Sequence, residues 1–440
     1  MRKLIKKFIP HELFRRIEPL GHWGEAILLN TINGFPAHGM KVIGVTGTNG
    51  KTTTAFLIHR LLHEAGYKVG LMSTVAYGVG DDIKPQMTHM TTSSVPVMMQ
   101  RFKAMRAQGV EWVVLETTSH ALAQHRVWGV PYSIAVLTNI TQEHLNYHGT
   151  FERYVAAKKM LFSQTDRNKK GLRLGIINAE DPQAENFAEP MDNVVFYGTN
   201  EADLKATNIK MTPDRTTYDA VHGKKTYHIT CNLPGSFNVY NSLAAVAVGE
   251  AVGLSATQIE QGIAALQSVE GRMMRIEEGQ DFTVIVDYAH TPDSYQKLFH
   301  DLKPVVKGRL IALFGSLGGG DEIKRGQQGE IAGKYATEVI ITEEDNRLEE
   351  PSRIMDMIAK GVEKAGKKRG KGYFVVDKRS EAIQFAVDRA QKGDTLLFLG
   401  KGHEKTIEDA AGEHPWDEVG EVRAALKRRL QQRKGSKKKS

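Results

Sequence analysis

The stretch Lys41-Val-Ile-Gly-Val-Thr-Gly-Thr-Asn-Gly-Lys-Thr-Thr53 decides how the first half of the chain folds. Its apolar beginning, 41–45, predicts a buried strand, and residues 53–66 carry apolar side chains at helical spacing. The glycine-rich turn between them ends in Gly50-Lys51-Thr52, directly before the helix. A strand, a glycine-rich turn, a Lys-Thr pair and a helix are the parts of a phosphate-binding loop. The stretch therefore predicts a nucleotide site at the start of an α/β domain.

Each part of this loop suits a nucleoside triphosphate such as ATP. Glycines let backbone N–H groups converge on phosphate oxygens, and the helix N-terminus adds a positive partial charge. Lys51 is expected to reach the β- and γ-phosphates, and the Thr52 hydroxyl to bind Mg²⁺. Val45 stands where the common pattern has its first glycine, so the loop is a variant form. The predicted nucleotide-binding residues of the loop are Gly47, Thr48, Asn49, Gly50, Lys51, Thr52 and Thr53.

The composition is that of an ordinary globular protein of two or three domains, with 440 residues, 41% of them hydrophobic and 25% charged. The single cysteine, Cys231, excludes a disulfide framework and an all-cysteine metal site, and it fits a reducing cytoplasm. The net charge of +8 is concentrated in a tail, because residues 427–439 carry eight Lys or Arg and no acid. We therefore expect a disordered basic tail over 427–440 and no nucleic-acid partner.

The chain begins with a basic amphipathic segment, 1–40, that predicts a short helical region. This helix is expected either to pack on the protein or to lie at a membrane interface, and we favour packing. No apolar run is long enough to span a membrane, although peripheral contact through the basic ends of the chain stays open.

Strands and helices then alternate, which predicts a parallel sheet in a central domain, 41–272. The expected strands after the loop are 69–74, 112–115, 134–138, 174–178 and 194–197. The strand 112–115 ends in Glu116, where a carboxylate is well placed to coordinate Mg²⁺. Two-residue alternation between 204 and 231 predicts a β-hairpin attachment.

A second alternating unit follows and predicts a Rossmann-like domain over 273–426. Its expected strands are 282–286, 310–314, 339–342, 373–376 and 395–399. The predicted fold class is therefore α/β: a central phosphate-loop domain with a parallel sheet, a C-terminal Rossmann-like domain and a short helical N-terminal segment.

Several further motifs are spread through both domains. They are Glu116–Leu122 with Gln124 and Arg126, Thr138–Gly149 leading to Lys158, Phe237–Asn241, Gly271–Met273, Asp287–Pro292 and Gly400–Glu404. Together with the loop, and in this order, they closely resemble the motifs of the Mur ligases, over about residues 41–426. Within that family the likeness is strongest to ligases that add the third residue of the peptidoglycan stem peptide.

The resemblance implies a reaction that uses ATP and Mg²⁺. The γ-phosphoryl group passes to the carboxylate of a muramoyl-dipeptide, and the amine of a diamino acid attacks the acyl phosphate. Lys51, Glu116, His144 and Lys158 match the catalytic positions, and Thr52, Glu116, His144 and a carbamylated Lys158 match the metal ligands. The resemblance places ATP between the two domains, with Asn241, Arg272, Asp287 and His290 as further nucleotide contacts.

The resemblance also implies residues for both other substrates. Thr91, Thr92, Ser119 and Arg126 match contacts to the muramoyl-peptide. The candidates for the amino-acid pocket are Arg325, Asp345, Asn346, Arg347, Gly400 and Glu404. Because the guanidinium of Arg347 can bind a carboxylate bidentately, it favours meso-diaminopimelate over lysine.

This sequence departs from the family pattern in several places. Glu143 and Asn146 stand where family members carry aspartates, and Glu344–Arg347 replaces the Asp-Asn-Pro-Arg of enzymes that add diaminopimelate. The family's UDP-binding N-terminal domain is longer than the residues 1–40 that precede the loop here, so whether the acceptor carries UDP stays open.

Two alternatives also stay open. One is a folylpolyglutamate-type or other amino-acid ligase on the same scaffold, which the short N-terminal segment favours. The other is a non-catalytic nucleotide-binding partner, for which a damaged ATP site would be expected.

Overall fold

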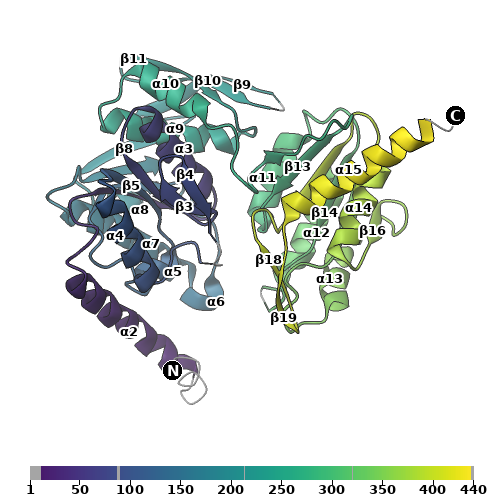
Figure 1. The fold of residues 1–440 in the computed structure, drawn as a ribbon, viewed down its shortest axis with the longest axis horizontal. Coiled ribbons are helices and arrows are strands. Elements are labelled where there is room, and N and C mark those ends of the chain that lie inside the picture. Colours follow the sequence, from purple (N-terminus) through teal and green to yellow (C-terminus); the bar gives the residue numbers. More distant parts are fainter. Residues whose placement is uncertain (1–10, 87–89, 213, 320, 438–440) are drawn as a thin grey trace. The chain divides into compact units, whose positions relative to one another are not determined.

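The computed structural model describes residues 11–86, 90–212, 214–319 and 321–437. The chain divides into two compact units, each a sheet with helices on its faces (Figure 1). Unit 1 comprises Met1–Lys210, Thr216–Asn232 and Phe237–Leu266, and unit 2 comprises Met211–Arg215, Leu233–Ser236 and Gln267–Ser440. This division falls a few residues before the boundary predicted after Arg272.

Unit 1 is built on an 11-stranded sheet in the order β11-β10-β9-β8-β7-β6-β1-β5-β2-β3-β4. Its parallel part consists of β1 (Lys41–Thr46), β2 (Val69–Met72), β5 (Trp112–Glu116), β6 (Tyr132–Leu137), β7 (Leu174–Asn178) and β8 (Asn193–Gly198), and β9 (Leu204–Met211) pairs parallel with β8. The antiparallel strands β3 (Ala76–Val79) and β4 (Asp82–Pro85) extend one edge. The other edge carries β9 and the hairpin β10 (Thr216–His222) and β11 (Lys225–Cys231).

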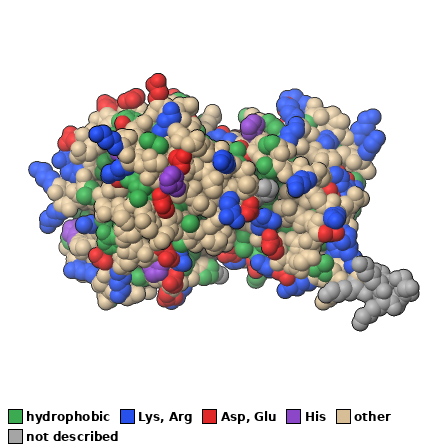
Figure 2. Space-filling view, turned by 90° about the horizontal axis from the view of Figure 1, so that it is seen from above, with side chains coloured by type: hydrophobic (Ala, Val, Ile, Leu, Met, Phe, Trp, Pro, Cys, Tyr) green, Lys and Arg blue, Asp and Glu red, His purple; other side chains and the backbone are tan. Residues whose placement is uncertain are grey.

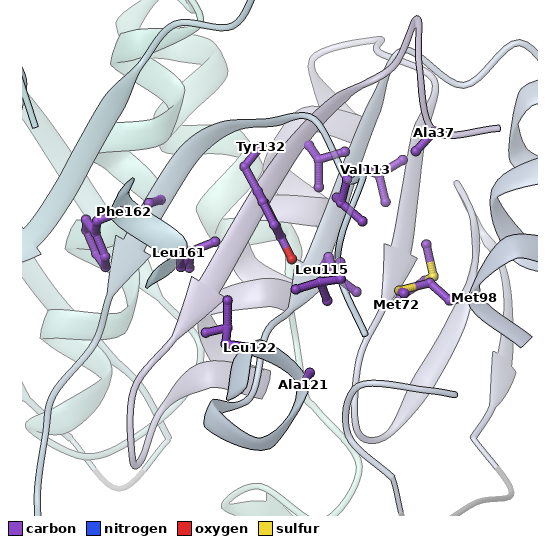
Figure 3. Packing of buried hydrophobic residues seen from close by; sticks show 14 of the residues in the cluster. Ala37, Met72, Met98, Val113, Leu115, Ala121, Leu122, Tyr132, Leu161 and Phe162 are labelled. Atoms are coloured by element: carbon purple, nitrogen blue, oxygen red, sulfur yellow. The ribbon is translucent and has the colours of Figure 1, made fainter. Parts of the chain in front are cut away.

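Helices flank this sheet and seal its core. They are α3 (Lys51–Glu64), α4 (Val95–Ala107), α5 (Ser119–Ala123), α6 (Leu145–His148), α7 (Phe151–Arg167), α8 (Ala184–Ala188), α9 (Phe237–Ala251) and α10 (Ala256–Ala265). In the core, Leu115, Tyr132 and Leu161 lie together (Figure 3). Gly44 of β1 lies against them, and a Cβ there would be 2.8 Å from the Tyr132 ring. The strand before the phosphate loop therefore requires a glycine at that point.

The N-terminal helix α2 (His11–Ile32) is attached to unit 1 through one of its faces. Ala26 and Asn30 are buried, and the Asn30 side-chain amide donates to the carbonyl oxygen of Trp128 at 3.0 Å. The predicted helical segment is confirmed over His11–Ile32, residues 33–40 form turns, and residues 1–10 lie outside the described part of the chain.

Unit 2 is built on a six-stranded sheet in the order β12-β13-β17-β14-β15-β16. These strands are β12 (Met274–Arg275), β13 (Thr283–Asp287), β14 (Leu310–Phe314), β15 (Glu338–Ile341), β16 (Tyr373–Val375) and β17 (Thr395–Leu399). All pairs are parallel except β12 with β13. Its helices are α11 (Pro292–Leu302), α12 (Ile323–Tyr335), α13 (Pro351–Lys364), α14 (Arg379–Arg389) and α15 (Glu418–Lys437). The predicted α/β fold class is confirmed in both units.

The predicted disordered tail is wrong for residues 427–437, because α15 continues to Lys437. Leu426 is buried in the core of unit 2, and the Arg429 guanidinium donates to the carbonyl oxygens of Val387 and Ala390. Basic residues of the tail are thus used in packing. On the face drawn in Figure 2, Lys and Arg side chains are interspersed with Asp and Glu. Within the described part of the chain, no helix combines the length and apolarity needed to cross a bilayer.

Candidate active site

The glycines of the phosphate loop, between β1 and α3, are required by close neighbours. Gly47 has a φ of 145°, and a Cβ there would lie 1.9 Å from Oγ1 of Thr138. Gly50 has a φ of 82°, and a Cβ there would lie 2.4 Å from Oδ1 of Asn241. Both the positive φ and the lack of room exclude a larger side chain at either position. The cradle shape of the loop is therefore set by the segments that surround it.

The segment after β6 holds the loop in place. The Thr48 N–H donates to the carbonyl oxygen of Asn139 at 2.7 Å, and the Asn49 N–H donates to Oδ1 of Asn139 at 3.0 Å. Thr138 Oγ1 donates to the carbonyl oxygen of Asn49 at 2.6 Å. Backbone and side-chain groups of two adjacent residues thus fix the loop before any nucleotide binds.

Two lysines meet at one carbonyl oxygen of the loop. Lys51 Nζ donates to the carbonyl oxygen of Gly47 at 2.9 Å, and Lys158 Nζ donates to the same oxygen at 2.6 Å. Lys158 comes from α7, is 2% exposed and lies over the ring of Tyr154 at 4.9 Å. Burial, and then the charge of Lys51, hold the pKa of Lys158 well below its usual value.

Glu116 lies at the end of β5 and is completely buried. Its Oε2 accepts from the hydroxyl of Thr52 at 3.2 Å and from the hydroxyl of Thr74 at 2.9 Å. Its Oε1 accepts from the backbone N–H of Thr74 at 3.0 Å. The hydroxyl and the carboxylate that the sequence predicts as metal ligands are therefore in contact with each other.

His144 lies at the start of α6, in left-handed backbone conformation with a φ of 56°. Its ring centroid is 6.2 Å from that of Tyr154, whose hydroxyl is 2.9 Å from Oγ1 of Thr48, so His144 lies close to the loop. The rings of His120 and His144 are 4.7 Å apart. Burial, followed by the two neighbouring histidines, lowers the pKa of His120 to about 3. His148 Nε2 is bonded to Oγ of Ser119 at 3.0 Å.

The predicted acceptor contacts surround the backbone of Glu116. Thr92 Oγ1 donates to the Glu116 carbonyl oxygen at 2.8 Å, and Thr91 Oγ1 lies 3.0 Å from Oγ1 of Thr74. The Arg126 guanidinium is buried, and it donates to the carbonyl oxygens of Ser93, at 2.9 Å, and of Thr92. Burial lowers the pKa of Arg126 to about 10, so the group stays cationic at neutral pH.

The remaining predicted nucleotide contacts are divided between the units. In unit 1, Asn241 Oδ1 accepts from Oγ1 of Thr54 at 3.2 Å. In unit 2, Asp287 accepts from the N–H groups of Met273 at 2.6 Å and Ala289 at 2.7 Å. Burial raises the pKa of Asp287, and the nearby Arg272 opposes this. His290 Nδ1 is 2.9 Å from the carbonyl oxygen of Tyr288.

The amino-acid candidates in unit 2 are joined by Lys401. Its buried Nζ lies 2.8 Å from Oδ1 of Asp345 and 2.7 Å from Oε2 of Glu404. Burial acts to lower the pKa of Lys401, but the two carboxylates outweigh it and raise the pKa. Asp345 Oδ1 also accepts from the N–H of Glu408 at 2.8 Å. Lys401 thus fixes two predicted amino-acid contacts with respect to each other.

Arg347 and Gly400 border this cluster. Arg347 has a φ of 55°, and its half-exposed guanidinium donates through Nε to Glu408 at 3.1 Å. Gly400 has a φ of 98°, and a Cβ there would lie 2.2 Å from Oε2 of the buried Glu344. Asn346 is buried beside Asp345.

The structure argues against the assignment of Arg325 to the amino-acid carboxylate. Its side chain is completely buried, and its two terminal nitrogens each lie 2.7 Å from an oxygen of Glu349. One of them also donates to the carbonyl oxygen of Leu317 at 3.0 Å. A guanidinium paired bidentately in this way is committed to linking the start of α12 to the loop before α13.

The chain offers a mixed set of ligands for a cation. Among the described residues, no three or more His, Cys, Asp or Glu side chains gather as a metal cluster. The Thr52 and Glu116 pair nevertheless fits Mg²⁺, which is commonly bound by one or two carboxylates together with substrate phosphates and water.

Four residues that support the site were not predicted for it. Asn139 and Tyr154 hold the loop, Thr74 holds Glu116, and Lys401 joins Asp345 to Glu404. Asn139 lies in the motif Thr138–Gly149 and Lys401 in the motif Gly400–Glu404, so the sequence motifs could have pointed to both residues. Thr74 carries no local signal, because the fold alone brings it to the carboxylate.

A parallel sheet with a glycine-rich loop, and a buried carboxylate at the end of the neighbouring strand, define a phosphate-loop nucleotide-binding protein. The family comparison is more specific: the Mur ligase middle domain matches residues 45–249, and the Mur ligase glutamate ligase domain matches residues 271–402. The chain belongs to the Mur ligase family.

Its relatives are similar over most of their length. The UDP-N-acetylmuramyl-tripeptide synthetase of Roseiflexus sp. (strain RS-1) is 40% identical over 408 residues, which cover 89% of this chain and 80% of the relative. The UDP-N-acetylmuramoyl-L-alanyl-D-glutamate–2,6-diaminopimelate ligase of Geobacillus thermodenitrificans is 39% identical over 413 residues, which cover 92% of this chain and 82% of that ligase.

Solved structures agree with this placement. A UDP-N-acetylmuramoyl-L-alanyl-D-glutamate–2,6-diaminopimelate ligase has a TM-score of 0.63 at 29% identity, covering 94% of this chain and 83% of its own. Mycobacterium tuberculosis folylpolyglutamate synthase has a TM-score of 0.71 at 16% identity, covering 92% and 95%, and shares the fold. The Mur ligase relatives are ATP-dependent enzymes that form amide bonds in peptidoglycan synthesis, and this chain is a ligase of that kind.

Proposed function

We propose that the chain joins a diamino acid to the free carboxylate of a muramoyl-dipeptide, with ATP cleaved to ADP and phosphate. The observation that carries this proposal is the meeting of Lys51 and Lys158 at the Gly47 carbonyl oxygen, beside the buried Glu116 and Thr52 pair. The identity of 39–40% to ligases of this specificity supports the choice of substrates. We place the reaction in the cytoplasm, where ATP is supplied.

In this proposal the loop binds the triphosphate and Lys51 neutralises charge on the transferred group. Lys51 now lies across its own loop, bonded to the carbonyl oxygens of Gly47 and Thr48. It exchanges those acceptors for phosphate oxygens when ATP binds, which costs little because both are hydrogen bonds from the same ammonium group. Mg²⁺ held by Thr52, Glu116 and His144 would supply further neutralisation of the phosphates.

Lys158 takes part as a carbamate. Its amine is buried, and burial and the charge of Lys51 lower its pKa, which favours the unprotonated form that attacks CO₂ over what an exposed lysine offers. The nitrogen lone pair forms the C–N bond, one C=O π pair moves onto oxygen, and one proton leaves the nitrogen, so that a neutral amine becomes an anionic carbamate. The product would attract both the metal and Lys51. We therefore expect ligase activity to fall several-fold in buffer stripped of CO₂ and to return when bicarbonate is added, as measured by phosphate release.

The acceptor and the amino acid use different surfaces. Thr91, Thr92, Ser119 and Arg126 surround the end of β5, where the carboxylate to be activated must approach the loop. In unit 2, Arg347 would bind a carboxylate of the incoming amino acid and Glu404 would bind its side-chain amine. A carboxylate on the side chain distinguishes diaminopimelate from lysine, so the exposed Arg347 favours diaminopimelate.

The test is release of phosphate from ATP with UDP-N-acetylmuramoyl-Ala-Glu as acceptor, with meso-diaminopimelate, lysine or neither. Release that requires both the acceptor and one diamino acid, with the matching gain in product mass, is the expected result. Lys51→Ala should lower turnover by at least about a hundredfold, because the charge on the transferred phosphoryl loses its cation. Lys84→Ala, which removes an exposed lysine on β4, is the matched control.

Turnover by Lys51→Ala at the rate of the unchanged protein would refute the role given to the loop. ATP binding without turnover on this acceptor would refute the acceptor. The same assay would then be repeated with muramoyl-peptides that lack UDP and with folate-type acceptors.

A further inference from the structure

Helix α2 has two apolar faces, and unit 1 covers one of them. The covered face carries Ala26, which is fully buried, and Leu29, which packs against the core of unit 1. Asn30 on the same face is bonded to Ala26 and to Trp128, at 2.9 Å and 3.0 Å. These contacts fix the orientation of the helix about its own axis.

The opposite face is apolar and open to solvent. Leu20 is 61% exposed, Leu28 58% and Ile32 70%, although large apolar side chains are normally buried. A Cβ added to Gly21 or Gly24 would have no heavy atom within 4 Å. With 3.6 residues per turn, these five positions fall within about one third of the helix circumference. Together with the exposed Thr31, whose hydroxyl donates to the carbonyl oxygen of Ile27, they form one uncharged stripe, which we call the outer face of α2.

The outer face carries no charge, and charge is concentrated before it in the sequence. Glu18 and Glu25 lie beyond the edge of the stripe by helical spacing and are half-buried. The segment 1–16 carries six Lys or Arg and a single acid, Glu12. An uncharged apolar stripe preceded by a basic segment is the pattern of helices that lie in the headgroup region of anionic membranes.

We propose that α2 binds an anionic lipid surface through its outer face. Leu20, Leu28 and Ile32 enter the boundary between headgroups and acyl chains, and the positive sequence charge of 1–16 adds long-range attraction to an anionic surface. Trp23, 40% exposed beside the stripe, suits the interfacial region because its ring is amphipathic. The covered face remains packed on unit 1, so binding requires no unfolding of the helix.

The attraction should have two separable parts, apolar burial and charge. Burial of three large aliphatic side chains supplies the first, and it is insensitive to salt. The basic segment supplies the second, which salt screens and which neutral lipid cannot provide. A surface that bound a protein partner or a second copy of the chain would show neither the dependence on lipid charge nor saturation with lipid.

The experiment is co-sedimentation of the full chain with vesicles of phosphatidylcholine alone or mixed equally with phosphatidylglycerol, at low and high salt. We expect binding to the mixed vesicles, weakened by salt, and little binding to the neutral ones. Leu28→Glu should reduce the apparent affinity at least about tenfold, because a charge would enter the apolar boundary. Ile209→Glu adds the same charge at an exposed apolar position of β9 in the same unit and should leave binding unchanged.

Absence of binding to mixed vesicles, or equal binding by Leu28→Glu and the unchanged chain, would overturn the proposal. Light scattering on the same samples distinguishes the main competitor. A dimer that dissociates on dilution and is lost in Leu28→Glu would assign the outer face to a second copy. Thermal unfolding of both variants checks that neither substitution unfolds unit 1, which is expected because both side chains are exposed.

Discussion

At the scale of single residues, Lys401 is the clearest positioning group. It is buried between Asp345 and Glu404. Lys401→Met should leave the two carboxylates facing each other without a cation, and one of them would take up a proton or turn away. We expect the KM for the amino acid to rise at least about tenfold while the KM for ATP stays unchanged. Stability should fall by about 3 kcal/mol, because a buried ion pair loses one partner.

A merely structural role for Lys401 would lower stability without a selective change in KM, and that outcome would contradict the assignment. Steady-state kinetics with each substrate varied in turn separates the two cases. In Lys401→Met/Asp345→Asn one carboxylate is neutral, so part of the lost stability should return. The comparison shows how much of the loss is repulsion between the two acids.

Single residues of the phosphate loop could be predicted because their chemistry is local. Lys51 and Thr52 follow from the order of the residues in one short stretch. The role of Arg325 could not be predicted, because its bidentate pairing with Glu349 depends on how α12 packs. Thr74 could not be found for a similar reason, since only the pairing of β2 with β5 brings it to Glu116.

At the scale of elements, the helix α3, which follows the phosphate loop, carries a buried histidine in the core of unit 1. His59 is 4% exposed, and its Nε2 has no hydrogen-bond partner. Burial, and then the neighbouring His63, lower the pKa of His59 from 6.5 to about 4. The unfolded chain binds a proton on this group near pH 6.5, whereas the folded chain does so only near pH 4. The free energy of unfolding is therefore not reduced by His59 above pH 6.5, and it falls as the pH is lowered from 6.5 towards 4 because the unfolded chain takes up the proton first.

The size of this effect follows from the shift in pKa, which corresponds to about 3 kcal/mol. His59→Asn removes the titration, so the difference in unfolding free energy between about pH 7 and about pH 4 should shrink by that amount. Urea unfolding at the two pH values measures it. His63→Asn, at a more exposed position of the same helix, should shrink the difference much less; an equal effect would show that burial of His59 is not the cause.

Most elements were predictable because each shows its own period of apolar residues. The parallel strands β1, β5 and β6 are short apolar runs, and α3 has apolar side chains at helical spacing. The helix α15 was missed beyond Leu426 because its sequence there is almost entirely polar and basic. Its helical packing depends on contacts from Arg429 to the carbonyl oxygens of Val387 and Ala390, which composition does not reveal.

At the scale of the whole molecule, each of the two units has its own sheet and its own core. We therefore expect two transitions in calorimetry. Diaminopimelate alone should raise only the transition of unit 2, which contains Asp345, Arg347 and Glu404. At about 100 times its Kd the gain is about 2.7 kcal/mol. Arg347→Ala should abolish this shift and keep both transitions, whereas a shift confined to unit 1 would contradict the assigned pocket.

Cys231 ends β11, and it is the chain's single cysteine and fully buried. A water-soluble disulfide reagent can reach this sulfur only when the β10–β11 hairpin opens. Its rate of modification therefore reports the opening of that edge of unit 1, without any engineered label. Measured over increasing denaturant, the rate separates local opening from global unfolding. Because Cys231 is buried, the folded protein exposes no thiol that reacts with such reagents. A cysteine introduced at the surface can therefore be labelled with a fluorophore at one known position.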